Sequence, residues 1–119
     1  MKSAMLLLSL AALGGLIGVS FWAAGHIGIQ HSIADLLAQP AAGNNPWLWA
    51  TLADAYFGFL WFWAWVAYKE RRWAARLGWL LAILATGNMA MAVYMLIQLA
   101  RLPAQATAAD LLLRTDARR

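Results

Sequence analysis

The chain contains three long apolar runs that almost lack charge, at residues 4–29, 46–68 and 77–100. Each exceeds the roughly 20 residues that an α-helix needs to cross the hydrocarbon core of a bilayer. Single strands of this length would leave their backbone groups unsatisfied in lipid. We therefore expect an all-α fold, an integral membrane bundle of three transmembrane helices.

The rest of the composition agrees with a lipid environment. Of the 119 residues only 12% are charged, and the mean hydropathy is +0.62. A soluble domain of this size could not bury so much apolar side chain. We expect one membrane domain over residues 1–119, with a tail from 101 to 119, and a lipid bilayer as its first partner. Cysteine is absent and no nucleotide-binding motif occurs, so neither a cofactor nor a thiolate metal site is expected.

Sequence signals mark several helix ends and flanking segments. Asn45 followed by Pro46 is typical of an N-cap and a first-turn proline, so the second run should start there. Residues 32–39 and the tail from 107 to 119 favour short amphipathic segments at the membrane surface, and residues 40–46 favour a loop. The first run is too long for the apolar core of a removable signal peptide, so we expect it to remain as a span.

Basic residues lie at the ends of the apolar runs, which indicates membrane topology and not a nucleic-acid surface. The connector at residues 69–76 is basic, whereas the connector at 30–45 holds no Lys or Arg. The positive-inside rule then places the N-terminus in the cytoplasm, most simply at a cell (inner) membrane. With three spans the margin is narrow, because five basic residues lie inside (Lys2, Lys69, Arg71, Arg72 and Arg76) and four outside (Arg101, Arg114, Arg118 and Arg119).

Asp54 is the one charged residue of the second run and our candidate catalytic residue. It lies about 12 Å along the expected helix from Pro46. A carboxylate at that depth is costly and usually faces a bundle interior or a wet cavity. It would act there as a proton donor or acceptor, or contact a ligand. Two plainer interpretations stay open, a structural hydrogen bond to another helix and a hydrated position near the interface.

Five further residues are candidates for ligand binding, because they supply polar or aromatic groups within the same apolar runs. An aromatic wall of this kind suits a flat apolar or cationic ligand such as a quinone or an isoprenoid. The alternative is a structural role, in which these side chains pack and form hydrogen bonds between helices. No histidine pair has the spacing of a metal site, so none is expected. The candidates are Tyr56, Trp61, Trp65, Asn88 and Tyr94.

More than half of the chain resembles the small membrane proteins grouped as domain of unknown function 1475. The resemblance is most specific in the stretches ATLADAY at 50–56 and WVAYKE at 65–70. It continues at scattered positions toward the tail. The resemblance implies a small membrane protein and carries no activity. The matching positions include Pro46, Trp47, Trp73, Gly87, Tyr94, Gln98, Leu99, Leu102, Pro103, Gln105 and 110–114.

Three functions remain open at this stage, so the sequence does not decide whether the protein is an enzyme. The first is an accessory or oligomerising membrane component, paired with itself or with a larger membrane complex. The second is a small membrane enzyme acting on an apolar or isoprenoid-type substrate, with Asp54 as general acid. The third is a proton-linked carrier or channel that uses Asp54.

Overall fold

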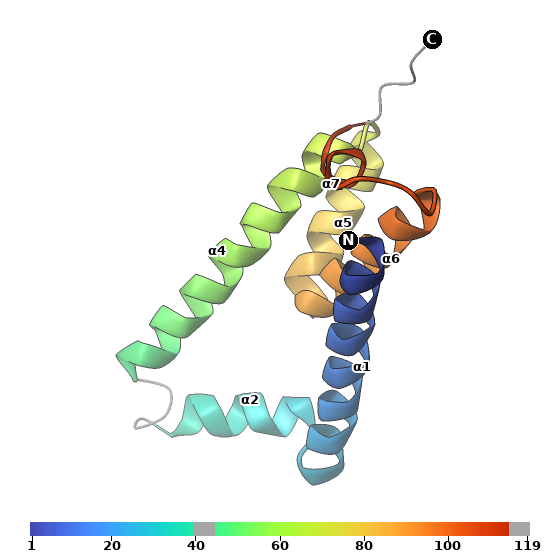
Figure 1. The fold of residues 1–119 in the computed structure, drawn as a ribbon. Coiled ribbons are helices and arrows are strands. Elements are labelled where there is room, and N and C mark those ends of the chain that lie inside the picture. Colours follow the sequence, from blue (N-terminus) through green and yellow to red (C-terminus); the bar gives the residue numbers. More distant parts are fainter. Residues whose placement is uncertain (40–44, 115–119) are drawn as a thin grey trace.

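The structure, a computed structural model, describes residues 1–39 and 45–114, and every regular element in these ranges is a helix (Figure 1). The all-α prediction is confirmed. The helices are α1 (Lys2–His26), α2 (Ile29–Ala38), α4 (Pro46–Lys69), α5 (Trp73–Thr86), α6 (Asn88–Arg101) and α7 (Ala108–Leu112).

Helix ends follow the local signals in most places. The side chain of Asn45 accepts a hydrogen bond from the backbone N–H of Trp47 at 3.0 Å, and Pro46 takes the first helical position. The expected surface segments form helices α2 and α7. Residues 40–44 of the expected loop and residues 115–119 of the tail lie outside the described residues.

The third expected span is wrong as a continuous helix, because the run from 77 to 100 is divided between α5 and α6 at Gly87. Gly87 has φ 56° and ψ −126°, a conformation that side chains disfavour strongly and glycine adopts readily. A Cβ built on Gly87 would lie 2.7 Å from Cζ of Phe59 on α4. The chain therefore reverses at this glycine, tightly covered by an aromatic ring.

The two halves of this hairpin pack against different long helices (Figure 1). Helix α5 runs antiparallel to α4, since Trp63 Nε1 donates to the carbonyl of Arg76 at 2.9 Å. Helix α6 runs antiparallel to α1, since Lys2 Nζ donates to the carbonyl of Leu102. A small core forms where the helices meet, from Val66, Ile83, Ala90 and Tyr94 with aromatic rings around them. Beyond the hairpin, α1 and α4 diverge, and α2 runs between their far ends.

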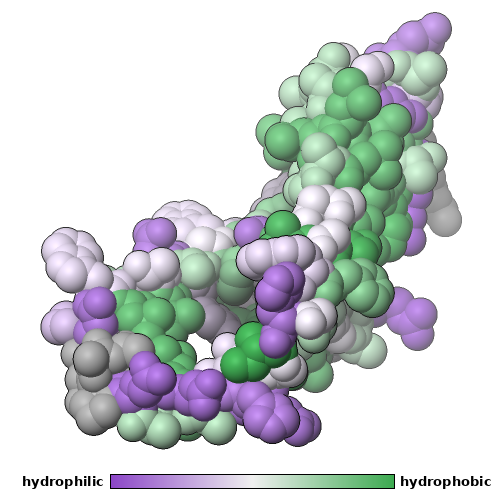
Figure 2. Space-filling model, turned by 90° about the horizontal axis from the view of Figure 1, so that it is seen from below, coloured by the Kyte–Doolittle hydropathy of each residue, from purple (hydrophilic) through white to green (hydrophobic). Residues whose placement is uncertain are grey.

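Much apolar surface stays exposed. Figure 2 shows a broad hydrophobic band on the face seen from below. Among the described residues, α1 is the one helix long and apolar enough to cross a membrane; its most apolar window has a mean hydropathy of 2.2 and is only 6% buried. The glycines of its G-x-x-x-G pattern, Gly14 and Gly18, face open space within this chain.

Replacement of Gly87 by alanine should destabilise the hairpin. The positive φ costs a non-glycine residue roughly 1–3 kcal/mol, and the new methyl group must also displace the Phe59 ring. Gly78→Ala is the matched control, because a Cβ there meets nothing within 4 Å. We expect thermal unfolding in detergent to shift down by several degrees for Gly87→Ala only. Equal melting of the two variants would contradict the assigned backbone turn.

Candidate functional site

The described tail folds back over the end of α4. Lys69 Nζ donates to the carbonyls of Leu111 and Leu113 at 2.8 Å each. Trp65 Nε1 donates to the carbonyl of Leu112 at 3.0 Å. The apolar anchor of this contact is Leu111, which is 3% exposed. These bonds hold the tail at the same end of the molecule as the connector between α4 and α5.

A local capping interaction explains the conformation in which the tail folds back over α4. Thr107 and Asp110 form a capping box that starts α7, with the Thr107 N–H donating to Asp110 Oδ2 at 2.8 Å. After the short helix α7 the chain continues in an extended conformation to Arg114. Its backbone N–H donates to the Tyr68 hydroxyl at 3.2 Å, and its Nη2 donates to the Glu70 carbonyl at 3.2 Å.

The connector between α4 and α5 and the described tail, residues 69–72 and 107–114, together form what we call the cap. Tyr94 lies beneath this cap and is 1% exposed. Its hydroxyl donates to Glu70 Oε1 at 3.0 Å. Three rings meet the Tyr94 ring edge-on, with centroid distances of 4.9 Å for Trp79, 5.6 Å for Trp65 and 6.2 Å for Phe62. Such contacts add packing energy to burial. Tyr94 thus links the aromatic core to the polar cap.

A polar cavity of about 450 Å³ opens at the cap, between the connector, the end of α6 and the tail. Its lining contains five cationic side chains and two acidic ones. Partial burial of the ammonium lowers the pKa of Lys69 from its ordinary value, and the neighbouring Glu70 opposes this shift. The lining residues are Lys69, Glu70, Arg71, Arg72, Gln98, Arg101, Leu102, Asp110 and Arg114.

The cationic side chains that line this cavity differ in whether they already donate hydrogen bonds to other residues. Arg72 and Arg101 donate no hydrogen bond to any residue in 1–39 or 45–114, whereas Lys69 is bonded to two tail carbonyls. Nε of Arg114 is buried without a hydrogen-bond partner in the same ranges. The acids are engaged, since Glu70 accepts from Tyr94 and Asp110 accepts from Thr107. The cavity is therefore suited to an anion.

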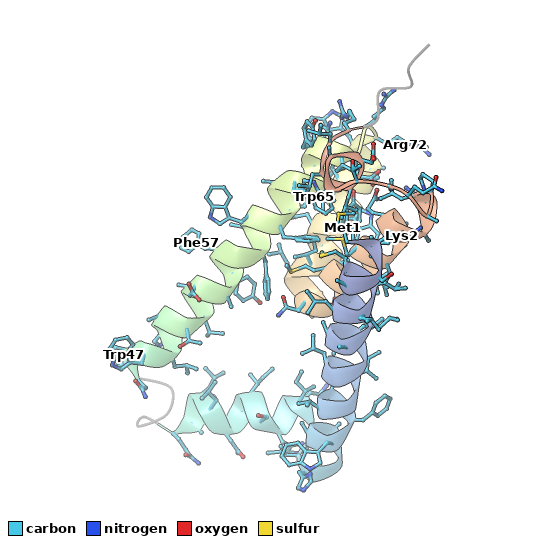
Figure 3. All side chains as sticks on the ribbon, viewed as in Figure 1. Met1, Lys2, Trp47, Phe57, Trp65 and Arg72 are labelled. Carbon is cyan, nitrogen blue, oxygen red and sulfur yellow. The ribbon has the colours of Figure 1, made fainter. Side chains whose placement is uncertain are left out.

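Of the residues expected from sequence, Asp54 lies apart from this cavity. It is exposed on the part of α4 that extends beyond the hairpin, and within the described ranges its carboxylate has no hydrogen-bond partner. Trp61 on the same helix is 80% exposed. Figure 3 shows Trp47 and Phe57, also on α4, pointing away from the other helices.

The other four candidates occupy three different places. Tyr94 and Trp65 lie together in the aromatic core below the cap. The Tyr56 hydroxyl approaches the Leu84 carbonyl at 3.4 Å. Asn88 is exposed at the start of α6 and lines an apolar cavity of about 450 Å³ with Ser9 and neighbouring apolar residues of α1 and α6. The structure therefore brings Trp65 and Tyr94 together and leaves Asp54, Tyr56, Trp61 and Asn88 outside their cluster.

Sequence reasoning missed the residues that build the cap. The basic connector was interpreted as a topology signal alone, although Glu70 stands there as a single acid among four cations. Arg72, Arg101 and Arg114 lie far apart in the chain, and only the reversal at Gly87 brings them together. The polar triplet Thr86, Gly87 and Asn88 in the middle of the run 77–100 is the signal that could have indicated this reversal.

Loss of the Tyr94 hydroxyl should weaken the link between core and cap. Tyr94→Phe removes a part-buried bond to a carboxylate, and hydrogen bonds to charged groups are worth about 1.5–3 kcal/mol. Tyr56→Phe is the control, because its hydroxyl is exposed and its contact is long. We expect a clear fall in unfolding temperature for Tyr94→Phe and little change for Tyr56→Phe. Unaltered stability of Tyr94→Phe would count against this role.

Comparison with known proteins identifies the family and no function. No curated protein and no solved structure matches the chain. A family model described as "Protein of unknown function (DUF1475)" matches residues 9–118, which is nearly the whole sequence, and confirms the resemblance. The chain belongs to this family of proteins of unknown function.

Proposed function

We propose that the chain is a component of a membrane, with α1 and α4 as spanning helices and α5–α6 as a hairpin that enters and leaves the bilayer on one side. Helices of 25 and 24 residues extend about 36–38 Å, enough for a core of about 30 Å. Of the two, α1 is also apolar enough to span by hydropathy, whereas α4 is proposed as a span on its length and on its place in the fold. Helices of 14 residues extend about 21 Å and are too short. This replaces the three full spans expected from the sequence.

The depth of the turn supports this arrangement. Gly87 meets the ring of Phe59, which precedes the end of α4 by ten residues, or about 15 Å of helix. That distance is half of the hydrocarbon thickness. Non-helical backbone is tolerated at such depth where protein covers it, and Gly87 is buried.

The observation that carries the proposal is the meeting of segments at the cap. A full span over 77–100 would separate the tail from Lys69 by a bilayer, yet Lys69 is bonded to Leu111 and Leu113. Lys2 is likewise bonded to Leu102. In Figure 3, Lys2, Trp65 and Arg72 lie toward the same end of the molecule.

Charge segregation follows from this topology. Within the described residues, every Lys and Arg belongs to the cap end, and α2 with the far ends of α1 and α4 carries none. The positive-inside rule then assigns the cap to the cytoplasm, with no described Lys or Arg on the opposite face. The narrow margin found for three spans disappears. The residues are Lys2, Lys69, Arg71, Arg72, Arg76, Arg101 and Arg114.

Two alternatives for α1 fit less well. A core helix of a soluble protein is mostly buried, whereas the apolar window of α1 is 6% buried. A removable signal peptide does not carry the packing of the mature fold, whereas α1 supplies the face against which α6 lies and buries Ser9 there. Both observations favour a retained span.

A non-catalytic, oligomerising role is favoured over an enzyme. The enzyme hypothesis requires Asp54, Trp61 and Trp65 around one pocket, but Trp61 is 80% exposed and Trp65 is bonded to the tail. An exposed carboxylate on a spanning helix is costly in lipid. Asp54 is therefore expected to be covered by a second copy of the chain or by another membrane protein.

Topology can be determined on single-cysteine variants, since the chain has no cysteine. Ser3→Cys, Gln39→Cys and Gln105→Cys occupy exposed positions at the chain start, after α2 and after α6. With a membrane-impermeant maleimide on intact cells, we expect labelling of position 39 and protection of positions 3 and 105 until lysis. Labelling of 105 from the same side as 39 would reject the hairpin.

Asp54→Leu tests assembly through α4. Single-molecule photobleaching in liposomes should show more than one copy per assembly for the wild type and mostly single copies for Asp54→Leu, because the polar contact is lost. Thr51→Val, one turn earlier on α4, is the control and should assemble as the wild type does. A wild-type protein that is monomeric at all densities would exclude pairing with itself.

A further inference from the structure

We infer that the cap cavity binds a phosphate group, either of an anionic lipid headgroup or of a free phosphate compound. The inference rests on the proposed topology, which sets this cavity at the level of the headgroups. It goes beyond the topology by assigning a ligand chemistry to a specific set of side chains.

The shape and charge of the cavity fit this ligand. A volume of about 450 Å³ accommodates a phosphate with part of a headgroup, and five cationic side chains face two acidic ones. Four of the five are arginines, whose planar guanidinium groups recognise phosphate oxygens in pairs. Basic pockets on the cytoplasmic side of membrane proteins bind anionic headgroups through the same chemistry.

The hydrogen-bonding state of the lining residues points the same way. The cationic side chains outnumber the acids that line the cavity by five to two, so the lining keeps a net positive charge. Glu70 and Asp110 also accept hydrogen bonds from the hydroxyls of Tyr94 and Thr107. Arg72 and Arg101 line the cavity from two elements, one at the start of α5 and one at the end of α6, with no hydrogen bond inside the described ranges. Two guanidinium groups that line one cavity and donate no hydrogen bond within the described residues are suited to a doubly charged anion.

Two of the segments that line the cavity are fixed to the rest of the fold by hydrogen bonds. The tail on one wall is fixed to α4 through Lys69 and Trp65. Glu70 on another wall is fixed by Tyr94, which belongs to the aromatic core. A ligand therefore meets arginines carried on anchored segments, which lowers the ordering cost of binding.

The test uses the full chain in a zwitterionic detergent and native mass spectrometry. The probes are dioctanoyl phosphatidic acid, inorganic phosphate and dioctanoyl phosphatidylcholine. Arg72→Gln and Arg101→Gln each remove a cavity cation that donates no hydrogen bond within the described residues. Lys2→Gln removes the same charge at the same end of the molecule, from a side chain that does not line the cavity, and the glutamine amide retains a donor for the Leu102 carbonyl. Thermal unfolding checks that each variant is folded.

We expect one phosphatidic acid per chain, with affinity about tenfold weaker in either arginine variant and changed less than twofold in Lys2→Gln. Inorganic phosphate that binds with the same arginine dependence would also support the site and assign a soluble ligand. Absence of binding, equal binding of phosphatidylcholine, or equal weakening in all three variants would overturn the inference. None of these results affects the topology, which cysteine labelling reads independently.

Discussion

The reversal of the chain at Gly87 is the constraint on which the other features depend. In lipid, a turn exposes backbone groups that water cannot satisfy, so it needs cover from protein. Here the N–H of Gly87 donates to the Ile83 carbonyl at 2.7 Å, Thr86 bonds back to Ala82, and the ring of Phe59 lies over the turn. The absence of a Cβ makes this close approach feasible.

The turn determines where charge accumulates. Because α5 and α6 return to their starting side, the connector, the end of α6 and the described tail converge. Arginines that are distant in sequence then share one cavity, and their repulsion is tolerable where water and anionic headgroups screen it. Lys69 and Tyr94 fix the tail and Glu70 in place beneath them. The proposed topology and the proposed phosphate site therefore both depend on one backbone conformation.

The sequence predicts the helices better than their arrangement. Asn45 and Pro46 mark the start of α4 because capping is a local interaction. The reversal at Gly87 was not predicted because spanning helices often contain glycine, although Thr86, Gly87 and Asn88 interrupt the apolar run. Asp54 and Trp65 are eleven residues apart, about three helical turns, and so lie on one face of α4. Only Trp65 lies beside α6, because the hairpin is too short to reach Asp54. Such pairings depend on long-range packing, which single-sequence patterns do not encode.

The central claim, that the chain returns to its starting side, is most directly tested by a distance measured inside a bilayer. Spin labels at Ser3→Cys and Gln105→Cys, in protein reconstituted into nanodiscs, report the separation of the start of α1 from the end of α6 by pulsed electron paramagnetic resonance. The account predicts a distribution centred well below the hydrocarbon thickness of about 30 Å. A distribution centred beyond about 35 Å, the length of a full span between the two labels, would contradict it.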